Sequence, residues 1–257
     1  MGKPKSVKKF LPEFLAARLD AEKRYGLRLT LFALAIVLAT LPFGLLLKAV
    51  VDRNPRLQSF DTALSEHLYG WTRGQEILVL ILKVLSFLGK PLWFYILIGG
   101  VSIYLFRLKR IRLMTFLIAT TAGGGIVDTI IKVAVNRGRP EVEIPLIHAV
   151  GKSFPSGHAM TSTIAYGALL LIFMPLVPRR WRPTALGATV LLVLAIGFSR
   201  LALGVHFVTD VIGGYVLGLS WLIAATAAFS IWRQERGRKP VEVKEGVEPE
   251  AARDLKP

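Results

Sequence analysis

Long apolar runs, separated by short polar or basic segments, set the tightest limit on how this chain can fold. The first run, residues 29–47, would extend about 28 Å as a helix, close to the roughly 30 Å hydrocarbon core of a bilayer. Backbone polar groups cannot reach water inside lipid, so spanning segments form helices or closed barrels, and runs of this length predict helices. The sequence therefore predicts an all-α integral membrane protein.

Six runs are long enough to be transmembrane helices: 29–47, 91–106, 113–132, 158–177, 184–203 and 207–232. Two shorter helices are expected after the first span. Residues 52–76 carry Phe60, Leu64, Leu68 and Trp71 at helical spacing, which is typical of a helix in the membrane interface. Residues 77–88 are apolar but too short to cross a bilayer, which predicts a re-entrant or interfacial helix.

The polar segments divide the chain into three parts. Residues 1–28 form a basic tail, 29–232 a six-span membrane domain, and 233–257 a charged tail that we expect to be disordered. The first run lacks a small-residue cleavage site, so we expect it to be retained as a span.

Basic residues predict the orientation. If both termini and the loops near 107–112 and 179–182 share one side, that side holds 22 of the 33 Lys and Arg residues. The positive-inside rule then places both termini in the cytoplasm. The net charge of +16 is concentrated in tails and short loops beside apolar runs, a placement that favours membrane orientation over nucleic-acid binding.

Three polar clusters interrupt the apolar sequence. They are Lys132-x6-Arg139-Pro140, Pro155-Ser156-Gly157-His158 and Ser199-Arg200-x5-His206-x3-Asp210. Ionisable residues at membrane depth are costly and usually functional. The predicted topology places all three clusters at the extracytoplasmic ends of spans three to six, where they can meet in one site.

Each cluster alone has a simpler interpretation. Lys132 could extend its amine to the interface or be neutralised by Asp128 one turn earlier, and Ser156 could be an ordinary helix cap. His206 and Asp210, four residues apart, could form a structural hydrogen bond. His67 lies beside the apolar stripe of 52–76 and is expected to be a surface residue. The joint occurrence of the clusters on one membrane face favours a functional site instead.

The combination predicts phosphoryl transfer without a metal ion. Lys132, Arg139 and Arg200 would bind a phosphate, and the amides of Ser156 and Gly157 at a helix start would add donors. His206 would attack phosphorus, while Asp210 would hold the other ring N–H. His158 would protonate the leaving group as general acid. The sequence contains no cysteine, which excludes thiolate metal sites and cysteine nucleophiles.

These clusters resemble the three-part signature of the type 2 phosphatidic acid phosphatase superfamily, and every fixed position is matched across residues 132–210. The layout of spans extends the resemblance over about 29–232. It implies an all-helical fold, a phosphohistidine on His206 supported by Asp210 and His158, independence from magnesium, and no cofactor. Bacterial members of this size act on phosphatidylglycerol phosphate, undecaprenyl diphosphate and related lipid phosphates. The resemblance thus implies a lipid phosphatase of a bacterial cytoplasmic membrane, with the bilayer and a lipid phosphate as its partners.

Two other functions remain open at this point. A lipid phosphotransferase would use the same intermediate but deliver phosphate to an alcohol or another lipid. A transporter or scaffold for anionic lipids would keep the cations, but it gives no reason for two histidines and Asp210. The sequence specifies neither the lipid headgroup nor the oligomeric state.

Overall fold

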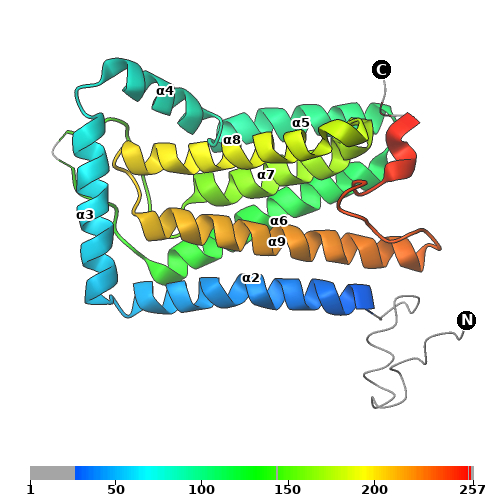
Figure 1. The fold of residues 1–257 in the computed structure, drawn as a ribbon, viewed down its shortest axis with the longest axis horizontal. Coiled ribbons are helices and arrows are strands. Elements are labelled where there is room, and N and C mark those ends of the chain that lie inside the picture. The colour runs from blue at the N-terminus through cyan, green and yellow to red at the C-terminus, as the bar shows by residue number, and fades with distance from the viewer. Residues whose placement is uncertain (1–26, 143, 254, 256–257) are drawn as a thin grey trace, which may run out of the picture.

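The structure is a computed structural model that describes residues 27–142, 144–253 and 255, so most of the basic tail 1–28 lies outside the described residues. Its α-helices form an elongated bundle (Figure 1). They are α2 (Leu27–Val51), α3 (Pro55–Thr72), α4 (Glu76–Phe87), α5 (Pro91–Arg107), α6 (Ile111–Val135), α7 (Gly157–Phe173), α8 (Arg182–Ala202) and α9 (Val208–Glu235). Short 3-10 turns follow at Met174–Leu176, Arg179–Trp181 and Pro249–Arg253.

Helix α3 crosses one end of the bundle, where the ends of α6 and α8 and the starts of α7 and α9 also lie (Figure 1). Its start is fixed by Asn54, whose side chain accepts hydrogen bonds from the amides of Arg56 and Leu57, and by Pro55 in the first turn. The face turned to the bundle is polar, whereas two of its aromatic residues are exposed. The buried residues are Asp61, Ser65, Tyr69 and Thr72, and the exposed ones include Phe60 and Trp71. This arrangement is expected for a helix in the membrane interface.

Small residues bring the central helices together. A Cβ atom added to Gly214 of α9 would lie 2.6 Å from the carbonyl oxygen of Ser156, and one added to Gly218 would lie 2.9 Å from that of Met160. In α6, Gly123 packs against Trp221, and Gly124 against Ile164. Close backbone approach through small residues is the usual way in which membrane helices associate. It fixes the starts of α7 and α9 relative to each other.

Four helical segments are long and apolar enough to cross a membrane: Ile111–Val135, Gly157–Leu176, Arg179–Ala202 and Val208–Glu235. A fifth span is counted if α4 and α5, bent by 46° at their junction, form one broken crossing. The described apolar part of α2 is shorter, Thr40–Val51. The predicted all-α membrane architecture is therefore confirmed, whereas the number six is not established.

The C-terminal segment differs from the prediction of a disordered tail. After α9, the chain folds back along the end of the bundle, and its apolar residues Val241, Val247, Ala251 and Leu255 are buried against α6 and α7. Arg233, which is 1% exposed, pairs with Glu248 and Glu250 of this segment. The high charge content suggested disorder, but these charges pair with arginines at the helix ends.

Candidate active site

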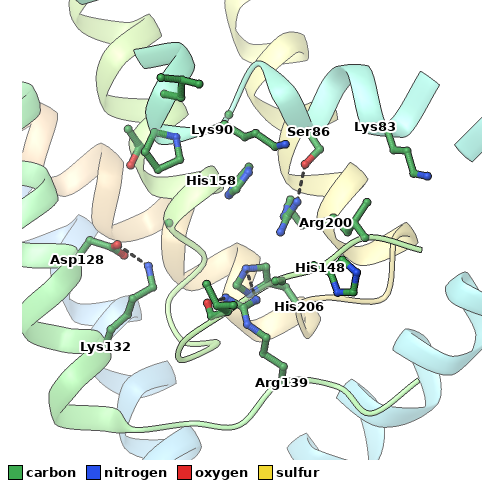
Figure 2. Close-up of a pocket in the computed structure, with 18 of the residues that line it drawn as sticks. Lys83, Ser86, Lys90, Asp128, Lys132, Arg139, His148, His158, Arg200 and His206 are labelled. Carbon is green, nitrogen blue, oxygen red and sulfur yellow. Dashed lines mark hydrogen bonds and ion pairs between the residues drawn. The ribbon is translucent and has the colours of Figure 1, made fainter. Parts of the chain in front are cut away.

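The three polar clusters converge on one cavity of about 730 Å³ at the α3 end of the bundle (Figure 2). The residues that line it include Lys132 from the last turn of α6, Gly157 and His158 from the start of α7, Arg200 from the last turn of α8, and Arg139 and His206 from loops. Residues as far apart in the sequence as Lys83 and His206 thus share one pocket. His67, by contrast, is exposed on α3, as predicted.

His206 is nearly buried and is held from both sides. Its Nδ1 lies 3.3 Å from Oδ2 of Asp210, and its Nε2 lies 3.1 Å from Nη1 of Arg139. A guanidinium can only donate, so Nε2 is the accepting nitrogen and the ring proton sits on Nδ1, where it donates to Asp210. The lone pair of Nε2 therefore lies on the cationic side of the ring.

Burial lowers the pKa of His206 to about 4, and the charges of Arg139 and Arg200 act in the same direction. The hydrogen bond and the negative charge of Asp210 oppose this effect without cancelling it. Burial disfavours the charged imidazolium because the interior solvates it poorly. The ring is consequently neutral at physiological pH, which is the form that can act as a nucleophile.

Arg139 organises the loops on the open side of the cavity. Its guanidinium donates to the carbonyl oxygens of Val205 at 2.8 Å, Val150 at 3.0 Å and Gly151 at 3.1 Å. The same guanidinium contacts His206, so one side chain joins the loop that follows α6 to the nucleophile candidate. Burial lowers the pKa of Arg139, but an arginine keeps its charge under physiological conditions.

The walls of the cavity carry polar atoms without hydrogen-bond partners among the described residues. These buried atoms are Asp128 Oδ1, His158 Nε2 and Arg200 Nε. Asp128 also forms a short ion pair with Lys132, the pairing that the sequence left open. Buried polar atoms normally have partners. Orphaned atoms on the wall of a cavity indicate a surface suited to a polar ligand.

One predicted donor is already used inside the protein. The amide of Ser156 donates to the main-chain carbonyl of Asp210 at 2.9 Å, and Ser156 is fully buried. The prediction that this amide faces a phosphate is therefore not met, because the close packing of α7 on α9 turns it toward α9. Gly157, the next residue, does line the cavity.

Comparisons with known proteins agree with this geometry. The sequence model of the PAP2 superfamily matches residues 113–234. Phosphatidylglycerophosphatase B of Bacillus subtilis (strain 168) is 34% identical over 184 residues, which cover 69% of this chain and 86% of that protein. This chain belongs to the PAP2 superfamily. The resemblance drawn from the three clusters is confirmed.

Other PAP2 relatives cover the chain to different extents. A crystal structure described as the first transmembrane PAP2 type phosphatidylglycerolphosphate phosphatase from Bacillus subtilis aligns with a TM-score of 0.69 and 26% identity, over 75% of this chain and 94% of that one. Lipid A 1-phosphatase of Rhizobium etli is 30% identical over 121 residues, 44% of this chain and 48% of that protein. The chain is thus a multi-pass membrane protein with the transmembrane PAP2 fold.

This PAP2 protein also contains an ion-pair network between Arg137 and two buried carboxylates, which the sequence did not predict. Arg137 lies 2.7 Å from Oδ1 of Asp210 and 2.7 Å from Oδ2 of Asp61 on α3. Asp61 is fully buried and also accepts hydrogen bonds from the amide and hydroxyl of Thr209. The network connects His206 through Asp210 and Arg137 to the interfacial helix. The sequence signal that could have revealed this network is Asp61, an acidic residue next to the apolar stripe of 52–76.

A second missed contribution comes from the turn between α4 and α5. Ser86 accepts a hydrogen bond from Nη1 of Arg200 at 2.5 Å. Gly89 packs so closely that an added Cβ would lie 2.8 Å from Cδ2 of His158. The short apolar segment 77–88 was predicted only as a membrane element, yet its end forms a wall of the PAP2 site.

No group of three or more His, Asp or Glu side chains in the described ranges is placed to hold a metal ion. The charged groups that face the cavity are mainly cations, which suit an anionic ligand.

Proposed function

We propose that this protein hydrolyses a phosphomonoester or diphosphate of a membrane lipid through a phosphohistidine on His206. The observation that carries the proposal is the neutral imidazole of His206, whose Nε2 lone pair lies beside Arg139 in a cavity that Lys132 and Arg200 also line. A nucleophile and three cations in one cavity match the needs of phosphoryl transfer, which depends on positioning and charge stabilisation.

In the first step, a phosphate binds between the three cations and takes over the hydrogen bond that Arg139 makes to Nε2. That nitrogen then attacks phosphorus in line, and the bond from phosphorus to the leaving oxygen breaks. The ring becomes positively charged during the attack, and Asp210 stabilises it through Nδ1–H. Arg137 keeps Asp210 in place.

His158 serves as the general acid for the leaving oxygen. It lies in the first turn of α7 and lines the cavity, and its buried Nε2 has no hydrogen-bond partner among the described residues, so no described group competes with a substrate for it. In the second step, His158 takes a proton from water, which attacks the phosphohistidine and releases inorganic phosphate. General acid and base roles of one group are required by microscopic reversibility. The cations replace a divalent metal as charge stabilisers, so we expect activity without magnesium.

For the topology, we propose six spans, with α2 as the first and the α4–α5 pair as the second. The turns that join α5 to α6 and α7 to α8 lie at the same end of the bundle as the start of α2 and the end of α9 (Figure 1). The positive-inside rule assigns that end to the cytoplasm. The site then opens at the extracytoplasmic face of a bacterial cytoplasmic membrane, at the depth of lipid headgroups.

Substrate access is expected from within the bilayer. Ile77, Leu80, Ile81 and Val84 on α4 are exposed and suit contact with lipid chains, while Lys83 and Ser86 of the same helix line the cavity. A lipid phosphate can therefore place its headgroup in the cavity while its chain remains in lipid. The names of two relatives, a phosphatidylglycerophosphatase and a lipid A 1-phosphatase, support lipid phosphates as the substrate class.

The test is a phosphate-release screen with purified protein in detergent, across phosphatidylglycerol phosphate, undecaprenyl diphosphate, phosphatidic acid and a soluble aryl phosphate. We expect a lipid substrate to exceed the soluble ester by about a hundredfold in kcat/KM, because chain binding contributes to turnover. Activity should persist in EDTA. Strict metal dependence, or no release from any lipid while the protein is folded, would contradict the proposal.

A phosphotransferase would show itself in the same screen. Lipid substrate would disappear without a matching release of inorganic phosphate, and phosphorylated acceptor would accumulate. A transporter or scaffold would bind lipid phosphate without turnover.

A further inference from the structure

The cavity contains one charge that works against the binding of a phosphate. Asp128, one turn before Lys132 on α6, is the one carboxylate among the described side chains that line the cavity. It forms an ion pair with Lys132, and the two side chains are 14% and 22% exposed. A carboxylate beside a bound phosphate repels it and offsets part of the attraction of the lysine. The mechanism proposed above gives this carboxylate no role.

The ion pair leaves most of the hydrogen-bonding capacity of Asp128 unused. Its Oδ2 accepts from Nζ of Lys132, whereas Oδ1 is buried and has no partner among the described residues. An ionised carboxylate offers about four acceptor positions and no donor. Rotation about the terminal bond of Asp, which has a broad range, can turn either oxygen toward a ligand. Asp128 therefore suits a ligand group that donates a hydrogen bond and disfavours one that presents only lone pairs.

Asp128 lies where a bound phosphoryl group would meet it. A Cβ atom added to Gly157, the first residue of α7, would lie 2.7 Å from Nζ of Lys132 and 3.1 Å from Oδ2 of Asp128, so the ion pair lies directly against the start of that helix. Figure 2 shows the pair on one side of the cavity, with Arg139 and Arg200 on the other. A phosphoryl group held between the two sides turns one of its oxygens toward Asp128.

The phosphoryl group of a monoester has two forms near neutral pH. The dianion presents lone pairs only, whereas the monoanion carries one P–OH that donates a hydrogen bond. Arg139 and Arg200 can only donate, so they suit the unprotonated oxygens, while Asp128 can only accept, so it suits the P–OH. The phosphodiester of a phospholipid has no P–OH and presents only acceptors to the carboxylate. Asp128 can thus distinguish a terminal phosphoryl group from a phosphodiester.

We propose that Asp128 is a specificity-determining residue, which accepts a hydrogen bond from the P–OH of a singly protonated phosphoryl group. The proposal rests on the function proposed above and adds which form of the phosphoryl group the site binds. It also explains how the site rejects the phosphodiester lipids that surround it. A site that hydrogen-bonds a hydroxyl discriminates strongly against ligands that lack one, because its own polar groups then lose water without gaining a partner.

The experiment compares two amphiphiles of the same chain length, an alkyl phosphonate and an alkyl sulfonate, at mildly acidic pH, where each carries one negative charge. Both headgroups are tetrahedral with three oxygens, but only the phosphonate has a hydroxyl. Affinity is obtained from the melting temperature of the purified protein as a function of the mole fraction of each amphiphile in the detergent micelles, because a ligand of the folded state raises that temperature. We expect wild type to bind the phosphonate at least about tenfold more tightly than the sulfonate. Equal affinities would overturn the proposal.

The variant Asp128→Asn separates recognition of the P–OH from simple pairing with Lys132. Asparagine has the same shape, and its amide both donates and accepts, so it suits both headgroups. We expect the preference for the phosphonate to fall to about a fifth of its wild-type value or less, chiefly because the sulfonate binds more tightly. If Asp128 only neutralised Lys132, the variant would bind both amphiphiles more tightly by the same factor, and an unchanged preference would reject the proposal.

Two controls accompany the variant. Asp52→Asn removes the carboxylate of an exposed pair with Lys48 at the same spacing and should keep the wild-type preference. Melting of Asp128→Asn without ligand shows whether it folds, and if it does not, the preference of wild type alone decides.

A phosphodiester lipid gives a second readout of the same discrimination. With phosphatidylglycerol added to the micelles, hydrolysis of phosphatidic acid should be inhibited at least about fivefold more strongly in Asp128→Asn than in wild type. Equal inhibition would show that Asp128 does not reject the diester.

Free phosphate carries the same P–OH as a lipid phosphate, and sulfate does not. If wild type prefers phosphate to sulfate but binds the two amphiphiles equally, Asp128 recognises only the free ion, and the proposal for the lipid substrate is rejected. Neither amphiphile has an ester bond to hydrolyse, so their affinities do not depend on turnover. A preference for the phosphonate without hydrolysis of any lipid phosphate would reject the phosphatase and retain the specificity, whereas hydrolysis without the preference would reject the specificity alone.

Discussion

Two arginines at opposite ends of the bundle, Arg137, which is partly buried, and Arg233, which is buried, each join two carboxylates, yet their surroundings differ. Arg137 lies between Asp61 and Asp210 at the end crossed by α3, beside the cavity. Arg233 lies between Glu248 and Glu250 at the other end, beneath the C-terminal segment.

The difference is in what the carboxylates face. Asp210 uses its second oxygen to hold His206, and through that ring it faces an open pocket with excess positive charge. Among the described residues, the other ion-pair partners of Glu248 are further arginines, Arg112 and Arg238, at 3.8 and 3.3 Å. Buried charge by itself therefore does not identify a site, because structural networks contain it as well. A cavity, orphaned polar atoms and a titratable nucleophile are needed in addition.

The largest effect is expected at His206. His206→Ala removes the proposed nucleophile, so turnover of any lipid phosphate should fall by at least about 10⁴-fold. Near-unchanged melting in detergent is the control for folding. Undiminished activity on a lipid substrate would show that the nucleophile is another group.

Asp210→Asn should reduce kcat less, by about a hundredfold to a thousandfold, because the ring remains but loses its charge partner.

The Asp210→Asn variant should also change the pH dependence of kcat/KM. Since Asp210 raises the pKa of His206 against the lowering by burial, its neutralisation should lower that pKa further. In wild type, kcat/KM should fall as pH drops through about 4, where His206 becomes protonated, and in the variant this fall should move to lower pH. When wild type and variant are assayed on the same substrate, ionisation of the substrate affects both pH profiles equally, so the difference between them reports on His206. A shift to higher pH would contradict the assignment.

Asp61→Asn should have a moderate effect, a decrease of about ten- to a hundredfold in kcat with little change in KM, because partners that orient a site residue typically contribute that much. The asparagine keeps an acceptor for Thr209 but withdraws a charge from Arg137. Asp61→Glu should restore part of the rate. Asp52→Asn, on the exposed Lys48 pair, is the control. A lower melting temperature with unchanged kcat would mean that the network is only structural.

The sequence was sufficient for the parts of the fold and site that depend on local pattern. Span length and apolar content predicted the helical membrane architecture, and the spacing of His206 and Asp210 predicted their contact. The contacts of Ser86 and Gly89 with the site could not be predicted, because they join segments more than 65 residues apart. For Asp61 the sequence shows an acidic residue beside the apolar stripe of 52–76, but not its partner Arg137, 76 positions further on. Nor could local charge density show that Glu248 pairs with arginines of α6 and α9, which is why the C-terminal segment was expected to be disordered.

Glu248→Gln should have the smallest effect on catalysis and tests the other half of the comparison. Glu248 is 3% exposed, and its loss of charge leaves Arg112, Arg233 and Arg238 facing one another without their shared carboxylate. Removing one member of a buried pair typically destabilises by about 3 kcal/mol, so the melting temperature in detergent should fall clearly. Because this cluster lies at the opposite end of the bundle from the cavity (Figure 1), kcat should stay within about twofold of wild type. Glu250→Gln, at the exposed carboxylate of the same cluster, should destabilise by less than about 1 kcal/mol. A large loss of kcat in Glu248→Gln, at a temperature where the protein remains folded, would show that the two ends of the bundle are coupled and that the contrast between them does not hold.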